Sequence, residues 1–187
     1  MKQTDLSKYT NDWYNPGAGK FKIALWYIVN ALFLINPLNP FGKLKVSLLR
    51  LFGAKIGKGV VIKQSVNIKY PWLLSIGDYT WIGERVWIDN LAQVTIGKNC
   101  GKNCCLSQGA MLLCGNHNYK KETFDLITGA ITIEDGAWVG ALSIVCPGVT
   151  LKTHAILSVS SVATETLEAY TMYKGNPAQE IRDRVIL

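Results

Sequence analysis

The chain has 187 residues, of which 49% are hydrophobic and 18% are charged, and it carries a net charge of +7 with a pI near 9.2. This composition excludes a disordered chain, and the length predicts one domain with a sizeable core. The positive charge favours an anionic partner, either a phosphate-bearing cofactor or an anionic membrane. No nucleic acid is expected, because the sequence has neither basic runs with interleaved aromatic residues nor the spacing of a zinc finger.

Residues 1–55 are predicted to form an N-terminal helical cap. The apolar stretch at residues 21–35 is interrupted by Lys22 and Asn30 and is followed by two prolines. A helix that spans a membrane needs about 20 apolar residues, so this stretch is too short and a buried helix is expected. The alternative is peripheral membrane association through residues 21–55, because residues 43–55 mix basic and apolar side chains.

From Ile56 onward, aliphatic residues recur every six positions, with a slip of two residues at two places. The first series is Ile56, Ile62, Ile68, Ile76, Ile82, Ile88, Val94 and Ile96. The later members are Leu106, Leu112, Ile133, Val139, Val145, Leu151 and Leu157. A small or branched residue often lies two positions earlier, as at Val60, Val66, Thr80, Val86, Ala137, Ser143, Val149 and Ala155.

A period of six fits neither an α-helix nor a simple hairpin meander, but it is typical of a parallel β-helix. Each hexad would supply one short strand and one turn, with the aliphatic residue pointing inward and the residue two earlier filling the corner. Glycine often follows the aliphatic residue, and we expect it to give the turn its backbone freedom. The predicted fold is therefore all-β, with the β-helix over residues 56–165; a β-sandwich is the less favoured alternative.

Two segments interrupt the repeat. The tetrad GKNC occurs twice in residues 97–104, and we predict that four residues loop out there at a corner. The polar loop at residues 115–130 is longer and contains His117, preceded by Asn116. Polar composition is typical of an exposed excursion from the wall, and such loops often carry function.

The cysteines are Cys100, Cys104, Cys105, Cys114 and Cys146. An odd number of cysteines without a signal peptide indicates reduced thiols in a cytoplasmic protein. If residues 21–55 bind lipid, the protein is expected at the inner face of the membrane. No pair of CxxC motifs is present, so buried structural cysteines are expected and no metal.

The chain resembles the hexapeptide-repeat acyltransferases in its [LIV]-G-x4 hexads, its Asn-His loop, the segment 136-GAWVGALSIVCPGVTL-151 and the terminal 175-GNPAQEIRDR-184. Within these it is most similar to the colanic acid biosynthesis acetyltransferases, which are relatives of the galactoside and maltose O-acetyltransferases. The resemblance covers nearly the whole chain, including Trp13, Tyr14 and Asn15. It implies a left-handed β-helix, a homotrimer with active sites between subunits, and acetyl-CoA as the donor. Residues 166–187 are expected to form a tail with a short C-terminal helix.

The resemblance also implies the site residues. His117 matches the family's catalytic histidine, and an imidazole with an ordinary pKa of about 6.5 is suited to take a proton from a hydroxyl at neutral pH. Apart from the resemblance, Asp89 and Asn90 lie one coil before the loop and supply a carboxylate and an amide that could bind acceptor hydroxyls, and Asp89 could instead orient His117. Asn116 and Trp138 are further candidates for binding the acceptor. Asp-Asn is equally good turn chemistry. Arg85 stands where the better-known sugar acetyltransferases have an asparagine.

The matching positions for CoA are Gly140, Ala141, Ser158, Val159, Ser160 and Thr164, with Lys174, Arg182 and Arg184 for its phosphates. The chain departs from the family at 159-VSS-161, at 165-ET-166 and at Gln179. The predicted function is acetyl-CoA-dependent O-acetylation of a sugar or saccharide intermediate in surface polysaccharide synthesis, with His117 as general base. The alternatives are N-acetylation of an amino sugar and an inactive β-helical scaffold.

Overall fold

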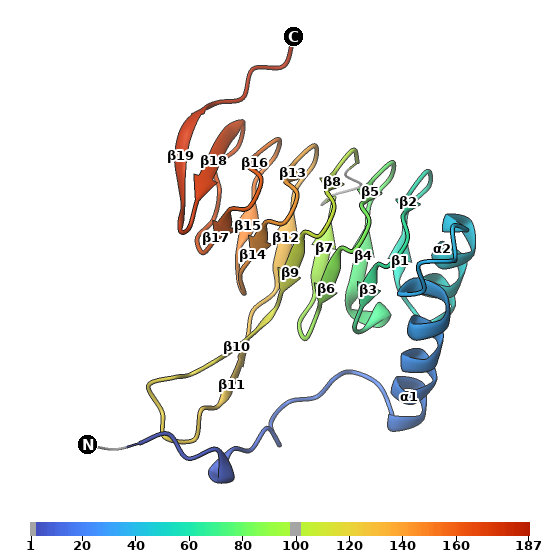
Figure 1. The fold of residues 1–187 in the computed structure, drawn as a ribbon, viewed down its shortest axis with the longest axis vertical. Helices are drawn as coiled ribbons and strands as arrows, with labels where there is room; N and C mark the ends of the chain where they lie inside the picture. The colour runs from blue at the N-terminus through green and yellow to red at the C-terminus, as the bar shows by residue number, and fades with distance from the viewer. Residues whose placement is uncertain (1–2, 98–101) are drawn as a thin grey trace.

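The computed structural model describes residues 3–97 and 102–187 and has the shape of a parallel β-helix with a projecting arm (Figure 1). Three sheets form its walls, and successive strands along the chain belong to successive walls. The first wall consists of β1 (Lys55–Ile56), β4 (Leu74–Ile76), β7 (Val94–Ile96), β12 (Ile131–Ile133) and β15 (Thr150–Leu151).

The second wall continues furthest toward the C-terminus and ends in an antiparallel hairpin. It consists of β2 (Val61–Ile62), β5 (Trp81–Ile82), β8 (Cys105–Leu106), β13 (Trp138–Val139), β16 (Ile156–Leu157), β18 (Thr171–Gly175) and β19 (Ala178–Asp183). The third wall consists of β3 (Asn67–Ile68), β6 (Trp87–Asp89), β9 (Met111–Leu113), β14 (Ile144–Val145) and β17 (Val162–Ala163).

The hexad positions fill the interior, as predicted. Ile62, Ile82 and Leu106 lie one above another in the second wall, and all are buried. The corner positions are buried too, including Thr80 and Ser143, except that Val60 in the first coil is only partly buried. Leu106 is in register with its neighbours despite the ten-residue interval after Ile96. The predicted bulge falls mainly on residues 98–101, which lie outside the described residues.

The glycine after the aliphatic residue gives the expected backbone freedom at Gly97, with a φ of +77°, but it has another reason at Gly83 and Gly140. Gly83 and Gly140 do not have a positive φ. A Cβ at Gly83 would instead lie 2.8 Å from the carbonyl oxygen of Leu106, and one at Gly140 would lie 2.7 Å from that of Leu157. Both positions require glycine because the backbone of the next coil approaches too closely for a side chain.

Helices cover the N-terminal end of the β-helix (Figure 1). They are α1 (Lys20–Val29), the π-helical turn η2 (Asn30–Leu34) and α2 (Gly42–Leu51), with a 3-10 turn η3 (Pro71–Leu73) in the first coil. The short 3-10 helix η1 (Leu6–Lys8) lies apart from them, beside the projecting arm (Figure 1). Trp26 anchors α1, since its ring packs 5.0 Å from that of Phe52 and its Nε1 donates to the carbonyl of Ile68 at 2.9 Å. Only one side of the apolar stretch is buried, and no described helix is long and apolar enough to cross a membrane.

The prediction of a C-terminal helix is wrong. Residues 171–183 form the hairpin β18–β19, and β18 pairs in parallel with β16. The open edge of β16 supplies unpaired backbone groups, and the N–H of Ser158 donates to the carbonyl of Tyr173 at 2.8 Å. Gly175, with a φ of +108°, and Pro177 form a tight turn that a helix interior does not accept.

Candidate active site

The arm that carries His117 is an antiparallel hairpin of β10 (Gly115–His117) and β11 (Leu126–Thr128). It leaves the third wall after β9 and returns to the first wall at β12, so it replaces one corner of the β-helix. The two sides of the arm are joined where it leaves the wall, because the N–H of Gly129 donates to the carbonyl of Cys114 at 2.9 Å. The predicted loop over residues 115–130 is therefore an ordered excursion of defined register.

His117 is held by the far side of its own hairpin. Its Nδ1 lies 2.9 Å from the carbonyl oxygen of Phe124, and the two rings stack at 4.5 Å with an interplanar angle of 7°. A carbonyl oxygen can only accept a hydrogen bond, so in the neutral ring Nδ1 carries the proton and Nε2 keeps the lone pair. This is the tautomer that a general base needs if it uses Nε2.

The N-terminal segment straps across the arm (Figure 1). The N–H of Asp5 donates to the carbonyl of Glu122 at 2.9 Å, and the ring of Tyr9 lies 5.8 Å from that of His117. The hydroxyl of Tyr14 donates to the carbonyl of Leu91 at 2.8 Å. Burial, followed by the nearby Tyr70 and acidic groups, raises the pKa of Tyr14, so this hydroxyl stays a neutral donor.

A polar cavity of about 580 Å³ lies between the strap, the arm and the third wall, and we call it the histidine pocket. Its size is within the usual range of small-molecule sites, about 300–1,000 Å³. It is lined by Tyr9, Asn11, Tyr14, Pro16, Lys69, Tyr70, Asp89, Leu91, Gly115, Asn116, His117 and Leu126.

Asp89 shares the pocket with His117 but has a different partner. Its Oδ1 lies 2.9 Å from Nζ of Lys69, an ion pair whose angles do not meet those of a hydrogen bond. The Nδ1 of His117 is already paired with Phe124, so the orienting group that the structure provides is a backbone carbonyl. Asp89 thus lines the pocket as the partner of Lys69 and does not orient the ring of His117.

Asn116 lines the pocket, whereas Asn90 does not. The Asn90 side chain is buried, its Oδ1 accepts from the N–H of Tyr70 at 2.9 Å, and its Nδ2 donates to the carbonyl of Tyr70 at 2.6 Å. The prediction that Asn90 binds the acceptor is therefore corrected, because its amide is used to fix the turn that carries Tyr70. Asn116 has an exposed side chain, and its Oδ1 accepts from the N–H of His117 at 2.8 Å.

The remaining predicted residues lie elsewhere on the β-helix. Trp138 is on the second wall, where its Nε1 donates to the hydroxyl of Ser107 at 2.8 Å. The residues expected to contact CoA lie mostly in the turns from the second to the third wall: Gly140, Ala141, Ser158, Val159 and Ser160. The arm with His117 leaves from the turn between the third wall and the first. A single chain does not bring the two corners together.

The cations expected for the CoA phosphates differ in their surroundings. Lys174 and Arg182 are exposed, and the register of β18 with β19 puts both on the outer face of the hairpin. Arg184 is half-buried, and its Nη1 donates to the carbonyls of Gly136 and His154 at 2.8 and 3.1 Å. Arg184 therefore links two successive coils, the one that contains Gly136 and the one that contains His154. Thr164 is exposed at the end of β17.

The cysteines in the described part of the chain do not form a metal site, since no group of three or more potential ligands occurs there. Cys104 and Cys114 are buried, and burial raises the pKa of each thiol to about 11. These two side chains act as small core residues.

Sequence reasoning missed Tyr9, Lys69 and Tyr70 in the histidine pocket. Lys69 had a usable signal, because β3 pairs with β6 at an offset of 20 residues, which puts Lys69 next to Asp89 in the following coil. Tyr9 had none, since its position depends on the path of the strap.

Comparison with known proteins gives the family. No family model matches the chain. The chain is 36% identical over 181 residues to the protein of Escherichia coli K12 that carries the name colanic acid biosynthesis acetyltransferase WcaF, with 97% of each chain covered. It is 24% identical to the galactoside O-acetyltransferase of the same strain over 139 residues, covering 73% of this chain and 67% of that one.

Solved structures share the fold. The hexapeptide-repeat acetyltransferase VCA0836 of Vibrio cholerae in complex with acetyl-CoA has a TM-score of 0.76 at 22% identity, covering 91% of this chain and 92% of that one. A maltose O-acetyltransferase of Clostridium difficile has a TM-score of 0.75 at 18% identity, covering 89% and 88%. The chain therefore belongs to the colanic acid biosynthesis acetyltransferases, which have the left-handed parallel β-helix fold of the hexapeptide-repeat acyltransferases.

Proposed function

We propose that the protein transfers an acetyl group from acetyl-CoA to a hydroxyl of a sugar or saccharide intermediate in surface polysaccharide synthesis. The observation that carries this proposal is the pairing of His117 Nδ1 with the carbonyl of Phe124, which leaves Nε2 of this pocket-lining residue free to act as a base. A relative with 36% identity is named for polysaccharide biosynthesis, and more distant relatives are named for sugar O-acetylation.

The chemistry follows from this tautomer. The acceptor hydroxyl attacks the thioester carbonyl while its proton moves to Nε2 of His117. The tetrahedral intermediate then collapses, the carbon–sulfur bond breaks, and the proton on Nε2 passes to the leaving sulfur to give the CoA thiol. The Phe124 carbonyl stabilises the imidazolium that exists between the two transfers, because it accepts from Nδ1 in both states. No covalent acyl-enzyme is needed.

The donor is proposed to lie along the turns between the second and third walls. VCA0836 and a galactoside acetyltransferase, whose solved structures share this fold, were determined with acetyl-CoA and with CoA. In this chain Gly140 and Ala141 are followed one coil later by Ser158 and Val159, and Val159 and the next residue, Ser160, are exposed. Lys174 and Arg182 are exposed cations near that end of the β-helix, suited to the phosphates of CoA.

We infer that the working enzyme is a homotrimer. The support is geometric: the arm with His117 and the proposed donor turns leave different corners of one chain, so the reacting groups meet only if a second copy supplies the other corner. Light scattering should give three times the chain mass of 20.7 kDa. A monomeric mass with full activity would refute the trimer.

The activity is tested by thiol release from acetyl-CoA in the presence of a panel of neutral, acidic and amino sugars. We expect release that depends on the saccharide, and a product whose acetyl group is removed by mild alkali, because an ester is labile and an amide is not. An alkali-stable product would show N-acetylation. Release with none of the saccharides would favour an inactive scaffold.

Peripheral binding to an anionic membrane is a second proposal, carried by an exposed apolar surface on the helices. We call it the helix patch: Phe21, Leu25 and Leu51, with Lys22 among them. Apolar side chains flanked by lysine are typical of helices that lie at a lipid surface. The protein should float with vesicles containing phosphatidylglycerol, and the variant Phe21→Ser/Leu25→Ser should not. Equal flotation of both would contradict this role. We also propose that the enzyme works in the cytoplasm, at the inner face of the membrane.

A further inference from the structure

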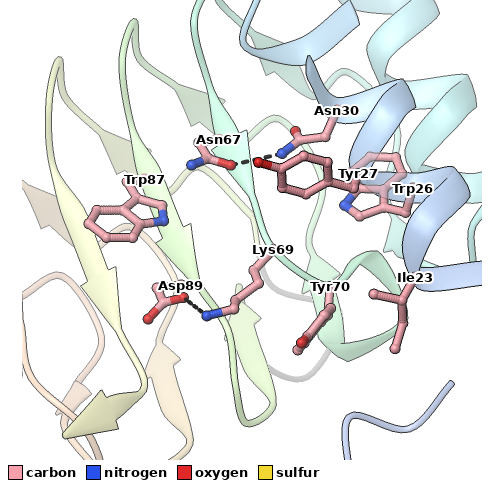
Figure 2. Close-up of a pocket in the computed structure, with 9 residues that line it drawn as sticks. All are labelled: Ile23, Trp26, Tyr27, Asn30, Asn67, Lys69, Tyr70, Trp87 and Asp89. Atoms are coloured by element: carbon pink, nitrogen blue, oxygen red, sulfur yellow. Dashed lines mark hydrogen bonds and ion pairs between the residues drawn. The ribbon is translucent and has the colours of Figure 1, made fainter. Parts of the chain in front are cut away.

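A second cavity adjoins the histidine pocket beneath the N-terminal helices (Figure 2). It has a volume of about 270 Å³ and lies between α1, η2 and the strands β3 and β6. Its wall shares Lys69, Tyr70 and Asp89 with the histidine pocket, so the two cavities are neighbouring parts of one depression. The ion pair of Lys69 with Asp89 lies at the boundary between them.

Aromatic rings form much of the wall of this second cavity. Trp87 projects from β6 and is 39% exposed, and Tyr27 projects from α1 and is 76% exposed (Figure 2). Tyr70 is held in place by stacking on Trp72 at 5.2 Å with an interplanar angle of 23°. Exposed aromatic rings beside amide groups suit a ligand that has both C–H faces and hydroxyl groups, which is the chemistry of a sugar ring.

Asn30 gives an independent indication that the cavity binds a polar ligand. Its side chain is 6% exposed and lines the cavity, and its Nδ2 donates to Oδ1 of Asn67 at 2.8 Å. Its Oδ1 is buried without a hydrogen-bond partner. A buried acceptor that lacks a donor is costly, and a small movement of the Asn30 side chain would bring this oxygen to a hydroxyl group in the cavity.

We propose that this cavity, the aromatic subsite, binds a second sugar ring of the acceptor while the ring to be acetylated lies beside His117. The subsite is formed by Tyr27, Asn30, Lys69, Tyr70 and Trp87. This proposal rests on the proposed function, and it narrows the acceptor class to saccharides of two or more rings. The volume, near the lower end of ligand sites at about 300 Å³, suits one ring and not a long chain.

The kinetic test compares matched acceptors, glucose with maltose and galactose with lactose. In at least one pair, kcat/KM for the disaccharide should exceed that for the monosaccharide by about tenfold or more. Trp87→Ala should bring this ratio toward one, while kcat/KM for the monosaccharide and KM for acetyl-CoA stay within about twofold. The matched control is Ile28→Ala, an exposed residue next to Tyr27 on the same helix that does not line either cavity, and it should keep the wild-type ratio.

Tyr27→Ala is a second variant that guards against a folding defect, because Tyr27 lies on the helix surface and its loss should leave the wall of the β-helix intact. It should lower the disaccharide preference in the same direction as Trp87→Ala. A wild-type enzyme without any disaccharide preference, or a preference that both variants retain, would overturn the subsite.

Direct binding separates the subsite from the proposed catalysis. Saturation-transfer NMR with maltose and lactose on His117→Ala protein should show disaccharide signals, and these should disappear when Trp87→Ala is added but remain when Ile28→Ala is added. Binding of this pattern supports the subsite even if no acetylation occurs. Absence of signals from both disaccharides, or signals that survive Trp87→Ala, would overturn it even if the enzyme acetylates monosaccharides.

Discussion

The Nδ1 atom of His117 lies 2.9 Å from the backbone carbonyl oxygen of Phe124. The two residues come from opposite sides of one hairpin, so the arm itself fixes the orientation and the tautomer of the histidine without a carboxylate. His117 and the carbonyl that orients it therefore move together if the arm moves.

This relationship predicts the tautomer directly. In 15N NMR at neutral pH, His117 should show a protonated Nδ1 and an unprotonated Nε2. Phe124→Ala keeps the carbonyl but removes the stacked ring, so we expect mixed tautomers and a kcat lower by about tenfold, with KM for acetyl-CoA unchanged. Phe124→Tyr should behave like the wild type. A protonated Nε2 in the unmodified protein would contradict this account of the base.

Gly129 is predicted to be essential for the return of the arm to the wall. A Cβ there would lie 2.4 Å from the N of Gly148 and 2.8 Å from the carbonyl carbon of Pro147. Both are backbone atoms of the next coil, so Gly129→Ala should reduce the free energy of unfolding by about 1–3 kcal/mol. Gly19→Ala has open space and should cost less than about 1 kcal/mol, the range of an altered helix cap. Equal urea midpoints for the two variants would contradict the close approach.

The buried lysine in α2 predicts a specific pH dependence of stability. Nζ of Lys45 is enclosed and donates to the carbonyl of Lys63 at 2.7 Å, and burial lowers the pKa of Lys45. Between this lowered pKa and the ordinary value of about 10.4, the unfolded chain binds more protons than the folded one, so the contribution of Lys45 to stability rises with pH.

Urea unfolding at pH 7 and pH 10 measures this contribution. The wild type should gain stability toward pH 10 relative to Lys45→Met, which lacks the titrating group. Lys43→Met is the matched control, because Lys43 is exposed on the same helix, and it should follow the wild type. If Lys45→Met and the wild type keep a constant difference between the two pH values, the buried amine does not titrate as described.

The repeat was predictable because every coil packs its inward side chains in the same way. The period alone predicts correctly that Ile82 and Val139 are buried, since a residue that points into the space between three walls must be apolar. The C-terminal hairpin was not predictable in this way. Residues 178–183 include good helix formers, but their antiparallel pairing with β18, which itself pairs with the open edge of β16, outweighs intrinsic propensity.

The site was predictable only where side-chain identity carries the chemistry. His117 stands out as a titratable group on a polar loop, and Asp89 as a carboxylate one coil before it. The Phe124 carbonyl belongs to the backbone, which has the same acceptor in every residue, so no sequence pattern reveals its role. Asn90 was misassigned because the same amide that can bind a sugar also fixes a turn.

A site shared between two copies predicts complementation. His117→Ala should lack the base, and Ala141→Trp should block the proposed donor turn, so each should be inactive alone. Chains mixed by co-refolding should regain about a quarter of the wild-type turnover, because random assembly pairs an intact arm with an intact donor turn at that frequency. Mixtures that stay inactive would show that one chain provides both halves of a site.

The most direct test of the central claim is kcat for acetyl transfer to the best saccharide acceptor by His117→Ala. Loss of a general base predicts a decrease of about 10²–10⁴-fold, with KM for acetyl-CoA nearly unchanged and the fold retained by circular dichroism. A kcat equal to that of the wild type would contradict the assignment of His117 as the base.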